Sequence, residues 1–514
     1  MLSVLILIAT VLLSSCCEGH KILVYSPKLL YGHVSFMGHV ADVLVEAGHN
    51  VVTPFLKDFT LRLPSSPEAT NFETALPGLK FLLSLVDRCE RFSYASDEIC
   101  PFFRLKKDIQ SNGPYQNSKE LQTRNWGALL GDVELIRRLR EEKFDLGISE
   151  AFSFCGFGIF EKIGLQKYLS AFSSEFIETL TEPYGISYNP SHVPGEDLTL
   201  LSRSSDIMSF IERVENFVIF GITYVLTRFI AAPHALQPFE EHIRRPFTTV
   251  ESIEILAKCP SIFINLNILL EYPREVNPKI VFVGGLTASR PSPLSEDFKR
   301  LMDESTGGVV LVSFGTVVLS SRMPPEVKSA FVSTFRHFPE ITFVWKYEVD
   351  DEVASDLPNV VKRKWVPQGD LLGHKNMVAF VSHCGTNGLG ESVNAAVPMV
   401  CIPVFFDQMH SAKKLEKQHT AFIIHKHNLT AQSLQWAFRT ILYDKSYSVS
   451  ARRISAMVRD AVIPIEEQIS RRARIAIKME EVEMVNPGSG RLNYLKFFFI
   501  DVISIPLILI IFLS

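Results

Sequence analysis

The sequence predicts an α/β protein with two domains, each built on a parallel sheet. Short apolar runs, typical of buried strands, alternate with amphipathic helical segments along most of the chain. The 514 residues exceed what one hydrophobic core usually serves and favour two domains of roughly 200 to 250 residues. In both halves a buried strand leads into a glycine-containing turn, the kind of connection at which open α/β sheets place their chemistry.

The composition excludes one broad class of function. Charged residues make up 21% of the chain, and the formal net charge is −4. No block of Lys and Arg forms a stripe that could follow a phosphate backbone, so nucleic-acid binding is set aside. Hydrophobic residues reach 47%, and the surplus is concentrated at the two ends of the chain. We therefore expect a globular protein with apolar terminal segments.

The N-terminal segment has the features of a secretory signal. Residues 2–13 form an almost unbroken apolar run, and small residues follow it. This length predicts a signal peptide over residues 1–19, although a buried first strand is the alternative. In an oxidising lumen Cys89 and Cys100 are near enough in sequence to pair, but the sequence leaves the connectivity open. Asn428 begins a sequon for N-glycosylation.

The first half opens with a βαβ pattern whose loop carries a candidate base. We expect a strand over residues 22–26, a helix over 34–47 and a strand over 51–55. His33 is predicted in the loop before the helix, at the carboxyl edge of the sheet. An imidazole has an unperturbed pKa suited to proton transfer near neutral pH. A loop histidine taken alone is more often an ordinary surface residue.

Two later segments of the first half bear on function. A helix over residues 126–142 leads to a strand over 144–150, which ends with Glu150 at the same sheet edge as His33. Residues 210–232 are conspicuously apolar. They fit a buried helix, the wall of an acceptor pocket or a helix on a membrane surface, and the buried helix is favoured. A spanning helix is disfavoured because charges bracket too short an interval.

The second half resumes the alternation after a linker over residues 281–293. A strand over 308–313 ends in a turn that contains Gly315, the second glycine turn after a buried strand. Either Ser313 or Thr316 could donate a hydrogen bond to a phosphate oxygen there. Further helices and strands then alternate, which is the pattern of a parallel sheet.

Residues 365–408 organise this second half. An apolar strand over residues 377–382 leads into a turn of small and polar residues over 383–388, a helix over 389–396 and a buried strand over 399–404. Such a turn aims backbone N–H groups and the positive end of the helix dipole at one point, which suits a phosphate. An ordinary βα turn gives the same pattern, so the flanking residues decide between the two interpretations.

Side chains on either side of this turn could hold the other parts of a nucleotide sugar. Trp365 and Gln368 offer an aromatic face and an amide able to pair with a base edge. Glu391 lies within the helix, placed to accept hydrogen bonds from a ribose. Asp407 and Gln408 follow the next strand, where a loop could reach the hydroxyls of a sugar. Together these residues predict a nucleotide-sugar site.

This segment resembles the signature of the UDP-glycosyltransferases, the membrane-bound glucuronosyl- and glucosyltransferases of animals. The order of parts agrees over nearly the whole chain. The residues that match the signature are Trp365, Pro367, Gln368, Asp370, Leu371, Leu372, Gly373, His374, His383, Gly385, Asn387, Gly388, Glu391, Asp407 and Gln408. The resemblance implies two facing Rossmann-like domains of the GT-B type. Residues 20–280 would bind the acceptor and residues 281–445 the UDP-sugar.

The resemblance also implies a role for each site residue. Trp365 and Gln368 would hold the uracil of the donor, and Glu391 its ribose. Asp407 and Gln408 would hold the sugar. The diphosphate would be held by the residues of the two glycine turns: Ser313, Gly315, Thr316, His383, Gly385, Asn387 and Gly388. His33 falls where the family keeps its catalytic base, and Glu150 where it keeps the acidic partner of that base. The family usually carries Asp at the second position, so Glu150 is a departure whose reach is one methylene longer.

The C-terminal part ends in an apolar tail. Helical patterns cover residues 430–443 and 449–483. We expect residues 446–493 to form C-terminal helices and residues 494–514 to form a short hydrophobic membrane segment. Only residues 502–513 are uninterrupted, which gives about 18 Å of helix against a hydrocarbon core of roughly 30 Å. With the resemblance, the tail predicts association with the endoplasmic reticulum membrane and catalytic domains in the lumen.

The expected function is inverting transfer of glucuronate or glucose from a UDP-sugar to a hydroxyl of a small lipophilic acceptor, as in xenobiotic conjugation, with His33 as general base. No Asp-x-Asp or His-rich set lies near the turns, so we expect no metal and no cofactor besides the donor. A homo-oligomer stays open. One rival is an oxidoreductase, disfavoured because no Gly-x-Gly-x-x-Gly turn follows either first strand. The other is a membrane-associated UDP-binding protein with weak or no catalytic activity.

Overall fold

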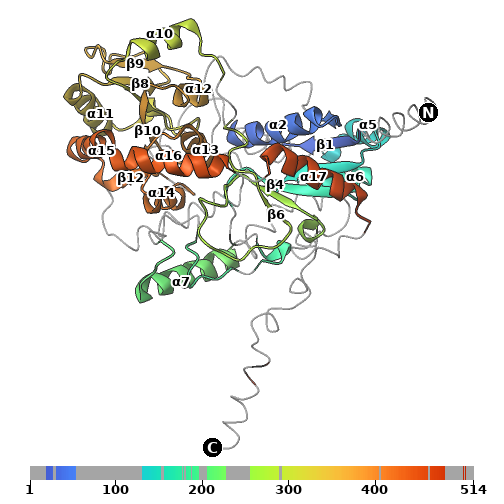
Figure 1. Cartoon of the computed structure of the whole chain (residues 1–514). Helices are drawn as coiled ribbons and strands as arrows, with labels where there is room; N and C mark the ends of the chain where they lie inside the picture. Colours follow the sequence, from blue (N-terminus) through green and yellow to red (C-terminus); the bar gives the residue numbers. More distant parts are fainter. Residues whose placement is uncertain are drawn as a thin grey trace, which may run out of the picture.

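The computed structural model has two α/β lobes, each with a six-stranded parallel sheet (Figure 1). Strands up to residue 282, coloured blue to yellow-green, build one lobe, and strands from residue 309 onward, coloured yellow to orange, build the other. The described residues are 19–26, 31–53, 130–151, 155–175, 178, 181–186, 188–195, 205–226, 255–288, 292–404, 407–460, 463–480, 502 and 504.

The first sheet has the strand order β2-β1-β3-β4-β5-β6, with parallel pairing throughout. Its strands are β1 (Lys21–Tyr25), β2 (Asn50–Val52), β3 (Leu146–Glu150), β4 (Tyr168–Phe172), β5 (Ile262–Ile264) and β6 (Ile280–Phe282). Successive residues of β1 enter different cores: Leu23 packs on one face of the sheet, and Ile22 and Val24 pack on the other. The sheet is therefore buried on both faces, as the continuous apolar runs predicted.

Helices from both ends of the chain cover this sheet. They are α2 (Tyr31–Glu46), α5 (Val133–Glu141), α6 (Cys155–Ile163) and α17 (Ile465–Lys478). Helix α17, dark red in Figure 1, returns from the C-terminal part and lies beside α2. Its Ile469 and Ala473 share a core with Phe36 and Val40 of α2. This packing ties the end of the chain to the first lobe.

The second sheet has the order β12-β11-β10-β7-β8-β9, again parallel. Its strands are β7 (Val309–Val312), β8 (Thr342–Lys346), β9 (Val360–Arg363), β10 (Met377–Ser382), β11 (Met399–Cys401) and β12 (Ala421–Ile423). Its α-helices are α10 (Glu296–Glu304), α11 (Pro325–His337), α12 (Gln368–Leu372), α13 (Thr386–Ala395), α14 (Gln408–Lys417), α15 (Ala431–Tyr443) and α16 (Lys445–Arg459). Short 3-10 turns are η5 (Glu182–Tyr184), η7 (Ser320–Arg322) and η8 (Lys426–Asn428).

Three boundaries near the site differ from those predicted. His33 lies in the first turn of α2 and not in the preceding loop. Helix α13 begins at Thr386, so Asn387 and Gly388 are helical and not part of the turn. Strand β6 extends the first sheet to Phe282, so the segment predicted as a linker begins within a strand. Apolar periodicity locates the middle of a helix well, but the first turn often carries no apolar residue to mark it.

The helix predicted over residues 449–483 is two helices in the structure, α16 and α17. Pro464 is the residue that precedes α17. Proline has no backbone N–H to donate and its ring clashes with the preceding turn, so a continuous helix cannot pass through it. The break lets α17 leave the second lobe and reach the first.

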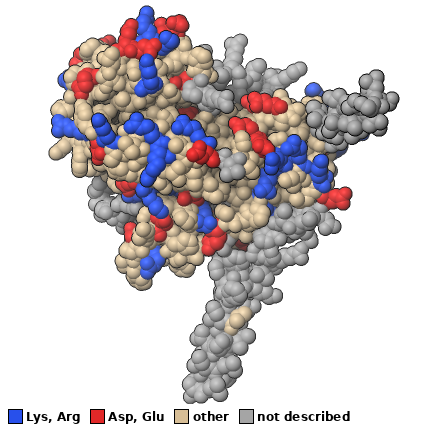
Figure 2. Space-filling model, viewed as in Figure 1, with Lys and Arg blue, Asp and Glu red and all other residues tan. Residues whose placement is uncertain are grey.

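The apolar segment 210–232 forms α7 (Phe210–Leu226), but the prediction that it is buried is wrong. Its buried side chains are polar: Asn216 and Thr223 are each 3% exposed, whereas Phe217 is 64% exposed. Asn216 is held there by hydrogen bonds to the Tyr188 hydroxyl and to backbone groups. The exposed apolar side chains are Phe210, Ile211, Val214, Phe217, Val218, Ile222 and Val225. In Figure 2 the surface over α7 is largely uncharged.

No described helix combines the length and the hydropathy that a membrane crossing requires.

One disulfide joins Cys384 to Cys401, a pairing that the sequence did not single out. It links the second residue after β10 to the last residue of β11, where the two parallel strands lie side by side. The pair Cys89 and Cys100 lies outside the described residues, as do the predicted signal peptide up to residue 18 and most of the tail. Asn428, the expected glycosylation site, is exposed in η8.

Candidate active site

The residues expected to bind the nucleoside meet at the carboxyl edge of the second sheet. Gln368 Nε2 donates to Glu391 Oε2 at 2.5 Å, and Ser313 Oγ donates to Gln368 Oε1 at 2.8 Å. Burial raises the pKa of Glu391 to about 7, so this carboxyl gains from any hydroxyls that donate to its ionised form. Gly388 lies beside the amide, since a Cβ there would stand 3.6 Å from Gln368 Nε2. Trp365 is 55% exposed, so its ring can stack on a base.

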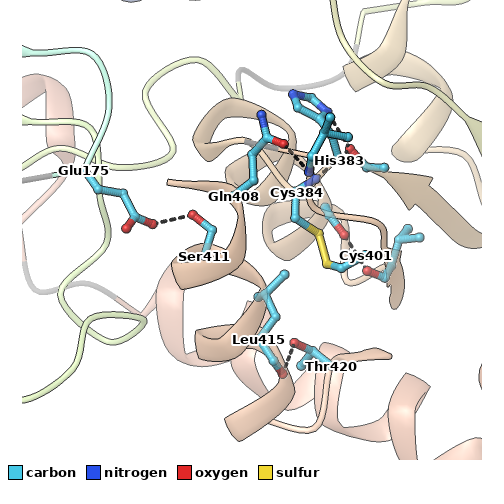
Figure 3. Close-up of a disulfide and its surroundings, with 12 residues drawn as sticks. Glu175, His383, Cys384, Cys401, Gln408, Ser411, Leu415 and Thr420 are labelled. Atoms are coloured by element: carbon cyan, nitrogen blue, oxygen red, sulfur yellow. Dashed lines mark hydrogen bonds between the residues drawn. A yellow bond between two sulfur atoms is a disulfide. The ribbon is translucent and has the colours of Figure 1, made fainter. Parts of the chain in front are cut away.

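The turn between β10 and α13 is a site for an anion. Gly385 is the N-cap of α13, and no described side chain caps the first turn of the helix. The backbone N–H groups at Thr386, Asn387 and Gly388 therefore point, with the helix dipole, toward the space above the turn. Cys384 holds a left-handed backbone conformation with φ of 60°. Its disulfide to Cys401 fixes this turn to the neighbouring strand (Figure 3).

The His383 ring lies between two glycine backbones. A Cβ on Gly315 would stand 2.9 Å from His383 Cε1, and a Cβ on Gly385 would stand 2.8 Å from Nε2. Both glycine turns are thus required for the ring to fit, and Thr316 continues the first of them. Burial and then the Lys346 charge lower the pKa of His383 to about 4, so near neutral pH the ring is a neutral hydrogen-bonding group.

The residues expected to hold the sugar begin α14. Thr386 Oγ1 donates to Asp407 Oδ2 at 2.8 Å. This hydrogen bond joins the residues expected to hold the sugar, Asp407 and Gln408 (the sugar loop), to the turn expected to hold the diphosphate, residues 383–388 (the phosphate turn). Burial and then the negative charge of Glu175 raise the pKa of Asp407 to about 6. Gln408 is only 4% exposed, and its Oε1 accepts a hydrogen bond from the backbone N–H of Val404 at 2.8 Å. This hydrogen bond holds the buried Gln408 side chain against the backbone at Val404.

His33 and Glu150 form a hydrogen-bonded ion pair in the first lobe. His33 Nδ1 lies 2.6 Å from Glu150 Oε1, and the Glu150 carboxylate is completely buried at the end of β3. Burial opposes protonation of the ring, but the charge and the hydrogen bond of Glu150 outweigh it and raise the pKa of His33 above its ordinary value. The extra methylene of Glu150 therefore does not prevent the contact that the sequence predicted.

Ser173 is a third member of this group that the sequence did not single out. Its Oγ lies 2.7 Å from His33 Nδ1 and donates to Glu150 Oε1, and its backbone N–H donates to the same oxygen at 3.3 Å. Ser173 directly follows β4, the neighbour of β3, so the sheet order puts it beside Glu150. The signal was a polar residue at the carboxyl end of a buried strand, but strand order cannot be read from a single sequence.

The two halves of the site face each other across the lobes. A Cβ on Gly32 would stand 2.6 Å from Asn387 Nδ2, so the start of α2 lies directly against the Asn387 side chain of α13. Asn387 Oδ1 also accepts a hydrogen bond from Asn265 of the first lobe at 2.8 Å. The His33 charge lies within electrostatic reach of Asp407. In the described part of the chain, no three His, Cys, Asp or Glu side chains are grouped so as to hold a metal ion.

The family is decided by a match to the model of the family described as "UDP-glucoronosyl and UDP-glucosyl transferase", which covers residues 20–472. The chain belongs to this family. It is a glycosyltransferase that binds a UDP-sugar and transfers the sugar to an acceptor. The described geometry brings Gln368, Glu391 and Ser313 together in the second lobe and pairs His33 with Glu150 in the first.

Curated relatives and solved structures agree with this assignment. UDP-glucuronosyltransferase 1A3 of Homo sapiens is 27% identical over 405 residues, covering 78% of this chain and 73% of the relative. The putative UDP-glucuronosyltransferase ugt-48 of Caenorhabditis elegans is 25% identical over 521 residues, covering 96% and 93%.

Two solved structures show the same fold. The UDP complex of UDP-glucose: anthocyanidin 3-O-glucosyltransferase has a TM-score of 0.54 at 16% identity, with 90% of this chain and 99% of that chain covered. The glycotransferase of kitacinnamycin has a TM-score of 0.54 at 15% identity, with 91% and 100% covered. The fold is therefore of the GT-B type.

A Ser173→Ala variant is expected to lower kcat/KM by up to about tenfold, the usual range for one hydrogen bond. Without the hydroxyl, the Glu150 carboxylate loses a hydrogen bond that stabilises its charge. It then interacts more strongly with the protonated His33 ring and raises the pKa of that ring. The acid limb of the pH profile should therefore move to higher pH, which a purely structural role would not cause. Ser173→Thr should restore the profile, and the neighbouring Ser174→Ala should leave it in place. An unchanged acid limb in Ser173→Ala would show that the hydroxyl does not act through His33.

Proposed function

We propose that the enzyme transfers the sugar with inversion to a hydroxyl of a small lipophilic acceptor and that His33 is the general base. The observation that carries this proposal is the His33–Glu150 pair, which faces the phosphate turn of the other lobe across the close approach of Gly32 and Asn387. A base and an anion site on opposite sides of one space are what displacement of UDP by an incoming hydroxyl requires.

In the proposed reaction the acceptor hydroxyl loses its proton to His33 as its oxygen attacks the anomeric carbon. His33 Nδ1 is turned toward Glu150, so Nε2, on the other side of the ring, takes the proton. The bond from the anomeric carbon to the UDP oxygen breaks on the opposite face, which inverts the anomeric configuration. Glu150 stabilises the imidazolium that forms, and the first turn of α13 stabilises the charge on the departing diphosphate.

The proposal requires no metal and no cofactor besides the UDP-sugar, because the first turn of α13 and the neighbouring glycine turn take the developing charge. The name of one structural neighbour, UDP-glucose: anthocyanidin 3-O-glucosyltransferase, gives an anthocyanidin as its acceptor. We propose an aromatic hydroxyl as the acceptor group here. Assembly into a homo-oligomer is compatible with this mechanism but is not needed for it, since both halves of the site come from one chain.

The activity test uses membranes from cells that express the full chain. They are incubated with UDP-glucose, UDP-galactose or UDP-glucuronate and a phenol such as 1-naphthol, and the products are read by mass spectrometry. We expect a conjugate with the mass of the phenol plus one sugar residue. NMR of its anomeric proton should show the anomeric configuration opposite to that of the donor. A conjugate with retained configuration would overturn the mechanism, and bound UDP with no conjugate from any phenol would favour the non-catalytic alternative.

We also propose that the enzyme works on the luminal side of the endoplasmic reticulum membrane. The apolar runs at residues 2–13 and 494–514 and the outward apolar face of α7 support this. Expressed in secretory cells, the protein should lose apparent mass on treatment with an endoglycosidase, because Asn428 is exposed and carries a sequon. Asn428→Gln should abolish the shift and Asn189→Gln, where Pro190 blocks modification, should not. A wild-type chain without a glycan would contradict luminal placement.

A further inference from the structure

A buried cluster of charges joins the two lobes directly behind the sugar loop. Glu175 of the first lobe accepts hydrogen bonds from three side chains of α14: His410 at 2.7 Å, Ser411 at 2.6 Å and Lys414 at 2.9 Å. Lys414 also lies 3.1 Å from Glu271. Figure 3 shows Glu175 reaching from the first lobe to Ser411 on the helix that carries Gln408. All of these side chains are at most 4% exposed.

Every basic side chain of α14 is engaged with a carboxylate of the protein. Lys413 pairs with Glu416 on the surface at 2.8 Å, and Lys417 pairs with Asp206. His410 and Lys414 pair with Glu175 inside. The pKa of His410 is lowered by burial and by Lys414, against the pull of Glu175, so the ring adds little positive charge near neutral pH. The helix that follows the sugar loop therefore presents cations whose charge is already neutralised.

The charge of the buried cluster is balanced, which leaves Asp407 as the carboxylate of the sugar loop. Glu175 and Glu271 share Lys414, Arg274 lies 3.8 Å from Glu271, and Asp407 stands at the N-terminus of α14. Burial and then the charge of Glu175 raise the pKa of Asp407, and they outweigh the Thr386 hydrogen bond and the charges of Lys414 and His33, which lower it. A second carboxylate brought beside Asp407 would meet the same field. Two like charges in a low-dielectric site repel strongly unless a cation lies between them.

We infer that the donor sugar is a neutral hexose and not a uronate, because the buried cation of α14, Lys414, is already held by Glu175 and Glu271. The inference rests on the proposed function, in which Asp407 and its loop contact the sugar. A neutral sugar needs only hydroxyl partners there, and the Asp407 carboxylate can accept from two of them. The C6 carboxylate of a glucuronate would have to enter this field without a cation from α14 to pair with.

The test compares the binding of UDP, UDP-glucose and UDP-glucuronate to the purified full-length protein by calorimetry at pH 7.5. We expect UDP-glucose to bind at least about tenfold more tightly than UDP-glucuronate, as one unscreened like charge implies. Glu175→Gln should narrow this ratio several-fold, because it leaves the charge of Lys414 less neutralised. Lys414→Gln should widen it. Glu416→Gln, which removes an acidic charge from the exposed side of the same helix, should leave the ratio unchanged.

The outcomes separate this inference from the proposed function. If UDP itself does not bind, the nucleotide site is wrong and the inference fails with it. If UDP binds and UDP-glucuronate binds as tightly as UDP-glucose or more tightly, the site stands and the inference alone is overturned. The wild-type ratio decides the question even if a variant at the buried cluster does not fold. Equal ratios in wild type, Glu175→Gln and Lys414→Gln would show that this cluster does not set the preference.

Discussion

Replacing His33 with alanine is expected to reduce kcat/KM for sugar transfer by about a thousandfold, within the 10²- to 10⁴-fold contribution usual for a general base. The loss should appear in kcat, because the ring acts on the acceptor proton and touches no part of UDP in the proposed site. UDP affinity, measured by calorimetry, should stay within about twofold of wild type, since the substitution leaves the contacts that bind UDP unchanged. His39→Ala serves as the matched control because His39 bonds only to the backbone of its own helix in the described contacts.

The pH dependence of the same reaction has a defined sign. The base works only when it is unprotonated, so kcat/KM should rise with pH through the pKa of His33. Glu150 raises that pKa above the ordinary value of 6.5, and the acid limb should therefore lie above pH 6.5. Glu150→Gln should move the limb down. Wild-type turnover in His33→Ala would show that His33 is not the base and that a different group takes the acceptor proton.

Replacing Glu391 with alanine is expected to weaken UDP binding by about 10- to 100-fold, as for hydrogen bonds to a buried charged group. The variant loses the proposed acceptor of the ribose hydroxyls. It also loses the oxygen that orients the Gln368 amide at 2.5 Å, so the base contact should suffer as well. Glu352→Ala, at an exposed position of the same lobe, is the control. Unchanged UDP affinity in Glu391→Ala would place the ribose elsewhere.

The wild-type enzyme should bind UDP-glucose more tightly as the pH rises from 6 to 8. Burial holds the pKa of Glu391 at about 7, and the ionised form accepts two hydroxyls better than the protonated form. The gain should therefore appear as pH rises through that value and be lost as it falls. UDP-glucose is the suitable probe because its diphosphate has no terminal phosphate that titrates in this range. Glu391→Gln should lose the part of this pH dependence that is centred near pH 7.

Much of the donor half could be predicted from the sequence because its parts are local. Strand β10 has the bounds that its apolar run predicted, and the turn after it, which contains His383, leads into the helix that carries Glu391. The His33–Glu150 contact was predictable only through the family resemblance, since 117 positions separate the two residues. Its geometry depends on β1 and β3 pairing side by side, which local patterns do not determine.

Contacts between distant segments could not be predicted from the sequence, because they depend on the order of strands in the sheets and on how the lobes pack. Ser173 and Glu175 follow a strand whose neighbours are known only from the sheet order, and Glu175 finds its partners on α14, more than 230 positions away. The face that α7 turns inward was also not predictable. Hydropathy favours burial of its apolar side, but the hydrogen bonds of Asn216 hold the opposite side against the protein.

The most direct test is a crystal structure of the enzyme with UDP-2-deoxy-2-fluoroglucose, a donor whose transfer is slowed. The account predicts that the diphosphate contacts the backbone N–H groups at the start of α13 and that the anomeric carbon faces His33. An acceptor oxygen about 3 Å from that carbon, on the face opposite UDP, should lie within hydrogen-bond reach of Nε2. A donor bound with its anomeric carbon turned away from His33, or with its diphosphate remote from α13, would contradict the central claim.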